Sequence, residues 1–567
     1  MDSKYHQDEK VGYNQYFVEK KDLKYLPPYL LDVPETREEV ICTTTGTWPT
    51  WLAGQFIRVG IGRVVIPLSE DGSKPDAVLQ HFFDGLNLLH KFRMEDGKVF
   101  YRSRYTAEGV VRRAKKEGRL TSIMTGLDAN TPLYRAQDPC SALLGTNQSL
   151  YLEDGKYEPD EVNINVVPRR GIHLPQPQGT RGVDSPETEE LLIGTDFNML
   201  QVCDAKTLEP KRLLTHAVID PELKGVGICA HPPKDRKRGQ TFNYLINQET
   251  GVMYVFGLDI RAKPAALMWK TALPCAPCYI HSLAMTERYV IFIRNPIHMD
   301  VSDMSKGLQE TWLYEPDVPT QFFVLEKDTG KHIATYSAPS FMFFHSVNAY
   351  DYVDADTGAT NVHVDLCSYE GGYIPYREYS FSNVIDPARP FKDGTLVRYE
   401  LASVDHALAT ISRPGRATVA AAIPGVPSEL PRIAKSASMM PGYRYVYFTA
   451  GNGGMSPGTQ VPIGRFGNGL KTVHGAFFGS LAKSDWLSGT YKRWQPGNGE
   501  SCPCEPVFIG RPGATEEDDG VVLTIVINRE GTQSILVALD GQTFEEIARA
   551  DMPHVYALGP HGTFIEA

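Results

Sequence analysis

Short strand-turn-strand patterns recur at widely separated positions of this chain, and this repetition is the feature that most constrains its fold. Three of them share one form: a run rich in β-branched and apolar residues, a short polar turn, and a second such run. They span residues 201–214, 322–335 and 534–547. Long helical periodicity is scarce. Many short hairpins in a chain of 567 residues exceed what one β-sandwich holds, so the sequence predicts an all-β fold with radial repetition, a β-propeller.

The composition limits the classes of partner. The chain has 57 Lys and Arg against 68 Asp and Glu, a net charge of −11. A protein that follows a phosphate backbone needs an excess of basic residues, so we expect no nucleic-acid partner. Hydrophobic residues make up 42% and charged residues 22% of the chain, which is typical of a globular protein with a large core.

The distribution of apolar residues and cysteines bears on the compartment. The first thirty residues contain no apolar segment like that of a secretory signal, and the longest apolar runs, such as 289–293 and 521–527, have the length of strands. We therefore expect no signal peptide and no transmembrane segment. Nine cysteines, an odd number, suit reduced thiols, which favours a cytoplasmic location. The oligomeric state is left open.

Two cysteine pairs offer a zinc alternative. Cys275 and Cys278, with Cys502 and Cys504, could supply four thiolates from two knuckles. The second pair has one residue between its thiols, a tighter spacing than zinc knuckles use. Isolated thiols in the core are the favoured interpretation.

Four histidines stand in distinctive contexts, namely His231 before two prolines, His281 in Ile-His-Ser, His345 in Phe-Phe-His-Ser and His561 in Gly-Pro-His-Gly. They are too dispersed for a local zinc finger. They could meet on the axis of a propeller if each came from a different blade. A site made only of imidazoles suits iron, copper or zinc better than calcium or magnesium. Any one of them alone is more often an ordinary hydrogen-bonded histidine.

Further motifs accompany these histidines in a fixed order. They are Gln-His-Phe-Phe-Asp-Gly at 80–85, Glu-Leu-Pro-Arg-Ile at 429–433, Tyr-Arg-Tyr-Val-Tyr at 443–447, Cys-Glu-Pro-Val-Phe at 504–508 and Glu-Glu-Asp-Asp-Gly at 516–520. Together they resemble the carotenoid cleavage oxygenase family, which includes stilbene-cleaving oxygenases and the retinal pigment epithelium isomerohydrolase. The resemblance runs from about Trp48 to the last residue.

The resemblance implies a seven-bladed β-propeller with a cap of helices and loops over an axial site. That site holds one non-haem Fe(II) per chain, with His231, His281, His345 and His561 as ligands. Residues 48–567 are then a single propeller domain with cap loops, and residues 1–47 are an N-terminal extension packed on it. Residues 167–190, rich in Pro, Gly and charge, are expected to form an extended surface loop.

Each imidazole that binds a metal needs an acceptor for its other N–H group, and a dication held by neutral ligands needs compensating charge. The family supplies three acidic residues for this purpose, and the matching positions are Asp196, Glu429 and Glu505. Asp196 stands where relatives carry Glu. Since its side chain is one methylene shorter, either its strand lies closer to the metal site or a water bridges the gap.

The resemblance also implies the reaction. The expected enzyme is an Fe(II)-dependent dioxygenase that uses O2 to cleave a conjugated C=C bond of a carotenoid or apocarotenoid into two aldehyde or ketone products. No catalytic side chain is expected beyond the metal site. The alternative is cleavage of stilbenes or of vinyl- or propenyl-phenols. Stilbene-cleaving relatives carry a Lys near the first acid, whereas Thr195 precedes Asp196 here, so a carotenoid is favoured over a 4-hydroxystilbene.

Other functions stay open. Ile164 could occupy the position that partly blocks one coordination site of the iron. An apolar residue there is found in the isomerohydrolase, so an isomerase-type activity remains an alternative. A non-catalytic propeller would have no reason to keep four histidines together with their acids, and a zinc hydrolase would normally use three ligands and a general base. Peripheral membrane contact is expected because carotenoids dissolve in bilayers.

Overall fold

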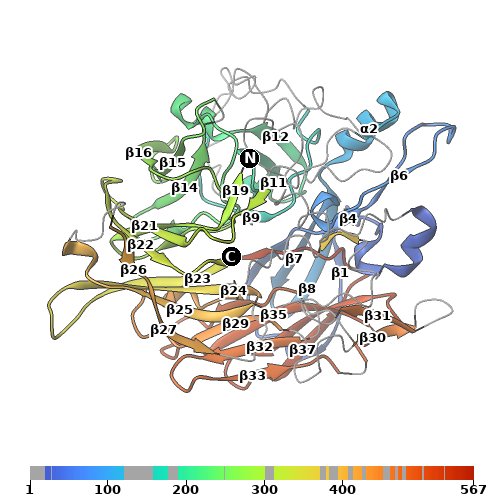
Figure 1. Ribbon diagram of the computed structural model, residues 1–567. Helices are drawn as coiled ribbons and strands as arrows, with labels where there is room; N and C mark the ends of the chain where they lie inside the picture. Colours follow the sequence, from blue (N-terminus) through green and yellow to red (C-terminus); the bar gives the residue numbers. More distant parts are fainter. Residues whose placement is uncertain are drawn as a thin grey trace.

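The computed structural model describes residues 19–567 except for 27, 121–157, 176–189, 248, 300–311, 371–378, 382–393, 407–412, 424–428, 451–459, 466–469, 475–479, 498, 501–503 and 529. Seven sheets of four to six strands surround a central axis, which confirms the seven-bladed β-propeller (Figure 1). The described part contains one α-helix, α2 (Glu108–Glu117), beside the blades.

The blades are named I to VII in the order in which their inner strands follow one another around the axis. Blade I contains the two ends of the propeller, with strands β1 (Val40–Ile41), β8 (Lys98–Tyr105), β7 (Leu86–Glu95), β3 (Gly54–Arg58) and β38 (Gly562–Glu566), and with β4 (Ile61–Arg63) on β7. Blade II contains β12 (Pro210–Leu214), β11 (Leu200–Asp204), β10 (Glu190–Gly194) and β9 (Val167–Arg169). Blade III contains β13 (Lys234–Asp235), β14 (Gln240–Ile246), β15 (Met253–Asp259) and β16 (Ala266–Leu273).

Blade IV contains β17 (Ala284–Met285), β18 (Tyr289–Arg294), β21 (Thr320–Glu326), β22 (His332–Ala338) and β26 (Gly415–Arg416). Blade V contains β23 (Phe341–Val353), β24 (Thr360–Glu370), β25 (Thr395–Leu401) and β27 (Thr418–Ile423). Blade VI contains β28 (Glu429–Arg432), β29 (Tyr445–Ala450), β32 (Ser480–Asp485) and β33 (Thr490–Trp494). Blade VII contains β34 (Val507–Gly510), β35 (Gly520–Ile527), β36 (Ser534–Asp540), β37 (Glu546–Asp551) and β2 (Thr43–Gly46).

Smaller elements lie outside the blades. Three two-stranded sheets pair β5 (Val65–Ile66) with β6 (Ala77–Val78), β19 (Ile297–Met299) with β20 (Trp312–Tyr314), and β30 (Gln460–Arg465) with β31 (Leu470–His474). The short 3-10 helices are η1 (Lys20–Tyr25), η2 (Pro28–Leu30), η3 (Phe82–Asp84), η6 (His216–Val218), η7 (Pro221–Leu223), η10 (Val404–His406) and η11 (Lys435–Ala437). Within the described residues, no helix has the length and apolar character needed to cross a membrane.

The three hairpins identified in the sequence are β11–β12, β21–β22 and β36–β37. An aspartate opens the turn in two of them: Asp204 accepts hydrogen bonds from the N–H groups of Lys206 and Thr207, and Asp540 does the same for the turn after β36. Such Asx turns fix the reversal locally. Each hairpin also has a register shift in its pairing, so these outer hairpins are copies of one structural unit.

The ring is closed by strands from distant parts of the chain. The strand β38 pairs antiparallel with β3, with Phe564 opposite Phe56. The two ends of the chain therefore lie in one blade, and the radial arrangement leaves only short sheet edges. The central strands are buried on both faces, as in β18 and β35, so apolar runs pack against the neighbouring blades.

Two segments expected to lie outside the blades contribute strands to them. Within residues 1–47, β1 pairs with β8 in blade I and β2 pairs with β37 in blade VII. The expectation of an extended surface loop over 167–190 is wrong at its start: β9 pairs with β10, and Pro168 is buried. Residues 176–189 of that segment lie outside the described residues. Strand pairing over long sequence distances overrides the local signal of Pro and Gly here.

Candidate metal centre

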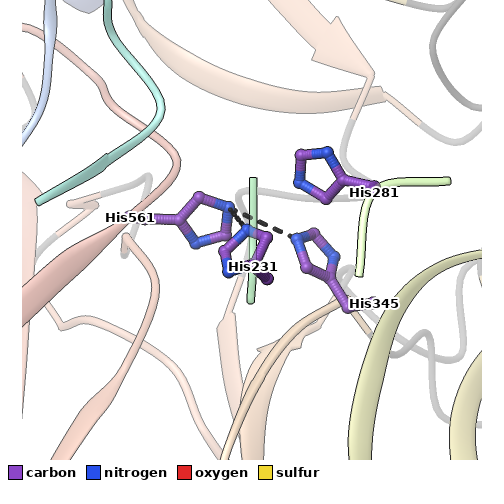
Figure 2. Close-up of side chains that lie close together, drawn as sticks. All are labelled: His231, His281, His345 and His561. Carbon is purple, nitrogen blue, oxygen red and sulfur yellow. Dashed lines mark hydrogen bonds between the residues drawn. The ribbon is translucent and has the colours of Figure 1, made fainter. Parts of the chain in front are cut away.

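The four histidines that the sequence singled out meet near the propeller axis, and each comes from a different blade. His231 and His281 lie just before β13 and β17, His345 lies within β23, and His561 immediately precedes β38. One potential ligand atom from each ring lies within 4.8 Å of all the others. Figure 2 shows the rings gathered around one centre.

The remaining three blades supply the three acidic residues. Asp196 follows β10 of blade II, Glu429 begins β28 of blade VI, and Glu505 precedes β34 of blade VII. All three are buried, with exposed fractions of 6% or less. Each of the seven blades therefore contributes one residue to the site, four imidazoles and three carboxylates.

The carboxylates orient three of the rings. Nδ1–H of His281 donates to Oδ1 of Asp196 over 2.9 Å, and Nδ1–H of His561 donates to Oε1 of Glu505 over 2.9 Å. His345 makes the same contact with Glu429. The contact of Asp196 is direct, so the shorter side chain is accommodated by its position and not by a bridging water. With Nδ1 protonated, Nε2 of each of these rings presents a lone pair.

Burial favours the neutral state that metal binding requires in three of the four rings. Burial lowers the pKa of His231 and of His281 below the ordinary value, and burial lowers the pKa of His561 to about 3 despite the opposing effect of Glu505. Burial penalises the charged form of an imidazole, and neighbouring imidazoles add to the penalty. At neutral pH these three rings therefore carry no positive charge.

The arrangement fits a bound cation. Nε2 of His281 is buried and has no hydrogen-bond partner. Nε2 of His561 lies 2.9 Å from Nε2 of His231 and 3.3 Å from Nε2 of His345, as the dashed lines of Figure 2 mark. His345 and His561 both donate through Nδ1, so no proton is left to lie between their Nε2 atoms. A cation between the converging lone pairs would remove this repulsion.

The charges around the centre are unequal. Arg432 forms two hydrogen bonds to the carboxylate of Glu505, at 2.9 and 3.0 Å, and the buried Arg58 lies 3.9 Å from it. Glu429 accepts hydrogen bonds from Tyr369 and from its neighbour's backbone N–H. Glu505 thus contacts arginines in addition to His561, whereas Asp196 and Glu429 contact their imidazoles without an ion pair to arginine among the described residues. Those two carboxylates supply the two negative charges that a dication needs.

A small apolar cavity lies beside three of the histidines. It measures about 30 Å³, and its lining includes His281, His345, His561, Phe83 and Phe344. The ring of Phe344 stacks on His281, with centroids 4.2 Å apart and planes inclined by 19°. Phe83 lies parallel to Phe344, with centroids 6.2 Å apart. The sequence did not predict this aromatic wall of Phe83 and Phe344, although Phe344 is adjacent to His345 in the Phe-Phe-His-Ser motif.

The motif at 80–85 positions Phe83 in that wall. His81 caps η3 by accepting a hydrogen bond from the N–H of Phe83 at its Nδ1. The side-chain amide of Asn163 donates to the carbonyls of Asp84 and Gly85, and Asn165 donates to that of Phe83. The histidine and aspartate of this motif are therefore structural parts of a turn that holds an aromatic ring over the metal centre.

Two residues named from the sequence lie away from the described cavity lining. Ile164 is fully buried in the hydrophobic core, and Val166, two residues further along, lines the cavity beside the histidines. This placement favours Val166 over Ile164 for a position facing the metal, because Val166 lines the same cavity as three of the histidines. Thr195 is buried next to Asp196 and lines neither described cavity.

The described cysteines are free thiols and do not gather around a metal. Cys278 and Cys504 belong to different hydrophobic clusters of the core. Cys502 lies outside the described residues.

Comparisons with known proteins agree with this architecture. The chain is similar to the torulene dioxygenase of Gibberella fujikuroi, with 28% identity over 94% of this chain and 92% of that protein. Its fold matches a variant of the Synechocystis apocarotenoid oxygenase with a TM-score of 0.67 and 20% identity, over 95% of this chain and 98% of the other. It also matches the lignostilbene dioxygenase of Pseudomonas brassicacearum with a TM-score of 0.66 and 20% identity, over 98% of this chain and 100% of the other.

The family model described as retinal pigment epithelial membrane protein matches residues 32–566, nearly the whole chain. The match includes all seven blades and the seven residues of the centre. This chain therefore belongs to the carotenoid cleavage oxygenase family, to which the retinal pigment epithelial membrane protein model corresponds.

Proposed function

We propose that this protein is a non-haem Fe(II) dioxygenase that cleaves a conjugated C=C bond of a carotenoid or apocarotenoid into two carbonyl products. The observation that carries the proposal is the convergence of four imidazoles, three of them fixed by buried carboxylates. His231, His281, His345 and His561 would hold one iron per chain. Bound there, iron supplies the capacity to activate O2, which no side chain provides.

The protein's own part in the reaction is to hold the metal and to position an apolar substrate. The carboxylates of Asp196, Glu429 and Glu505 keep the rings in the tautomer that presents Nε2. Phe83 and Phe344 present aromatic faces to the cavity beside His281. An electron-rich conjugated chain can pack against such faces and is shielded there from water.

The cavity sets a condition on substrate binding. At about 30 Å³ it is far smaller than a carotenoid, so the aromatic side chains that line it must move apart when a polyene enters. A substrate with a long apolar chain gains most from this opening, because more apolar area leaves water.

The substrate class follows from two considerations. The similar protein from Gibberella fujikuroi is named a torulene dioxygenase, and torulene is a polyene. Thr195 stands where stilbene-cleaving relatives are expected to carry Lys for contact with a phenol. A hydroxystilbene would find no cation at this position, so we place a carotenoid first and a stilbene or vinyl-phenol second.

Two further features are part of the proposal. A lipophilic substrate reaches the protein from a bilayer, so we infer a peripheral and transient membrane contact. The described cysteines are free thiols, which suits a cytoplasmic location. Sedimentation with vesicles of neutral phospholipid, with and without dissolved carotenoid, measures the first; microscopy of the tagged chain in its own cells measures the second.

The test of the reaction is product analysis. Protein reconstituted with Fe(II) is incubated with C40 carotenoids, apocarotenals, hydroxystilbenes and vinyl-phenols, under 18O2 and without O2, and the products are identified by chromatography and mass spectrometry. Oxygen-dependent pairs of carbonyl products from a polyene are expected, with label from 18O2. Products from stilbenes alone would shift the substrate to the second class, and isomerised substrate without oxygen uptake would overturn the dioxygenase.

A further inference from the structure

A second and larger cavity lies on the other side of the histidine cluster. It measures about 640 Å³ and is lined by His231, whereas the other three histidines line the small apolar cavity. Among the described residues, the two cavities share no lining residue. The chain passes from one to the other at Val166 and Val167, at His345 and Ser346, and at His561 and Gly562. The metal centre therefore separates an apolar cavity from this second cavity.

The second cavity is strongly cationic. Its described lining contains one carboxylate, that of Glu566, and six basic side chains: Arg169, Arg170, Lys234, Arg236, Arg432 and Lys435. Of these side chains, Arg432 pairs with Glu505 and Lys435 pairs with Glu566. The protein carries a net charge of −11, so this concentration of positive charge runs against its overall balance.

The buried guanidinium group of Arg169 is the feature of this cavity that most favours a bound ligand. Its Nε and Nη2 atoms are buried and have no hydrogen-bond partner among the described residues. Burial lowers the pKa of Arg169 to about 10, and the opposing effects of Cys229 and of the Asp196 carboxylate offset this only in part. The guanidinium lies against Gly194, where a Cβ atom would fall 1.9 Å from Nη2. The absence of a side chain at Gly194 makes room for a cation whose donors are left unsatisfied by the protein.

Arg236 provides a second cation at the cavity wall. It is exposed at the cavity wall and forms no ion pair within the described part of the chain. It lies in the same turn region as Lys234, whose ammonium donates to the carbonyls of Arg170 and Gly171 at 3.0 and 3.3 Å. These two hydrogen bonds hold the Lys234 ammonium at the cavity wall beside Arg170. Carbonyl oxygens carry no formal charge, so the two bonds leave the charge of the ammonium in place.

We propose that this cavity binds a small multivalent oxyanion, carrying carboxylate or phosphate groups, next to the metal centre. Guanidinium forks match the two oxygens of a carboxylate or phosphate group, and buried donors without partners gain most from such a ligand. The volume exceeds that of a single phosphate and accommodates a tricarboxylate. The positive field disfavours entry of a free metal cation by this route, and the site differs in character from the apolar cavity that we assign to the alkene.

The proposal is tested by titration calorimetry on the full-length protein freed of metal. The probes are citrate and inorganic phosphate, in a chloride buffer of low ionic strength. Metal-free protein is used because citrate would otherwise compete for iron, and the result is then independent of the oxygenase reaction. Binding of either probe at one site per chain is expected. Citrate alone indicates a polycarboxylate ligand, phosphate alone a phosphorylated one, and both a general oxyanion site.

Matched variants locate the site. Arg236→Gln should raise the Kd of the bound probe by about tenfold, the effect of removing one charge-assisted hydrogen bond. Arg236→Lys should change it by less than about threefold. The control is Lys237→Gln, because Lys237 is adjacent in the chain, 81% exposed and absent from the cavity lining among the described residues. Wild-type protein that binds neither probe, or equal Kd values for Arg236→Gln and Lys237→Gln, would overturn the proposal.

Discussion

The carboxylate of Asp196 reaches the ring of His281 directly, with Oδ1 2.9 Å from Nδ1. The family pattern calls for the longer Glu at this position, so the end of the strand must bring the shorter side chain within reach. The same His281 presents a buried Nε2 without a partner to the centre of the site. One face of this imidazole is thus fixed by the protein, and the opposite nitrogen is available to a metal.

Removing the charge of Asp196 should weaken metal binding. Asp196→Asn keeps the shape but loses the negative charge that favours the donating tautomer of His281, so we expect iron affinity to fall by about 10- to 100-fold. Competition with a chromophoric chelator measures it. Asp328→Asn is the control because Asp328 is 72% exposed and distant from the centre. Equal affinities in the two variants would rule out a role for Asp196 in holding the metal.

His281→Ala should abolish retained iron. The variant removes one of four converging nitrogens and the ring that stacks on Phe344. Iron content after desalting, measured by atomic emission, is expected to fall from about one per chain to near zero. His298→Ala serves as the comparison, since His298 is half-buried and belongs to no described metal cluster. A full complement of iron in His281→Ala would show that this residue is not a ligand.

Arg432 should govern stability in acid. Burial raises the pKa of Glu505, but Arg432, His561 and Arg58 lower it by more, and the net pKa lies well below the ordinary value. A carboxyl of this kind stabilises the fold above its unfolded pKa of about 4.3, and that stabilisation is lost as the pH falls through the folded pKa. Arg432→Gln removes part of it, so the metal-free variant should unfold at a higher pH than the wild type.

Circular dichroism during acid titration checks this expectation. Arg416→Gln is the control, because Arg416 is exposed in the short strand β26. Coincident acid midpoints for Arg432→Gln and the wild type would contradict the role given to Arg432.

Gly559 should tolerate no side chain. A Cβ atom at this position would fall 1.7 Å from the carbonyl oxygen of Val59, so Gly559→Ala must push the segment that carries His561 away from the chain after β3. We expect a loss of about 1–3 kcal/mol in the free energy of unfolding together with weaker iron binding. Thermal unfolding and iron content measure the two effects. Gly497→Ala is the matched change, because a Cβ there meets nothing within 4 Å; a similar loss in both would refute the steric explanation.

Much of this centre could be predicted from the sequence because its residues sit in short motifs. His345 and Glu429 each stand in a short motif of the family, and such a motif can be recognised without knowing which distant strands pair. The contact of Asp196 could not be settled in this way, since one methylene is decided by where a strand ends relative to a ring from another blade. The choice between Ile164 and Val166 has a similar cause, since the two residues are only two positions apart and the three-dimensional path of the chain decides which of them lines the cavity.

Features that depend on contacts between separate segments of the chain escaped prediction. The strand β9 forms because it pairs with β10. The local composition around β9, rich in Pro and Gly, gives no sign of this pairing because β10 lies about twenty residues further along the chain. The cationic cavity draws Arg169, Lys234 and Arg432 from three blades, and no spacing in the sequence links them. Phe344 could have been found, since it adjoins a histidine motif; its stacking on His281 could not.

The closure of the ring by β38 has a consequence for biosynthesis. His561 immediately precedes this strand, and β38 pairs with β3, more than five hundred residues earlier in the chain. A ribosome-bound chain that has made the strands of blades II to VII holds three of the four imidazoles but lacks both the fourth and the strand β38 that completes blade I. Metal capture and ring closure thus depend on the same last stretch of translation, so a prematurely terminated chain would expose open sheet edges to the cell's proteases and would acquire no metal.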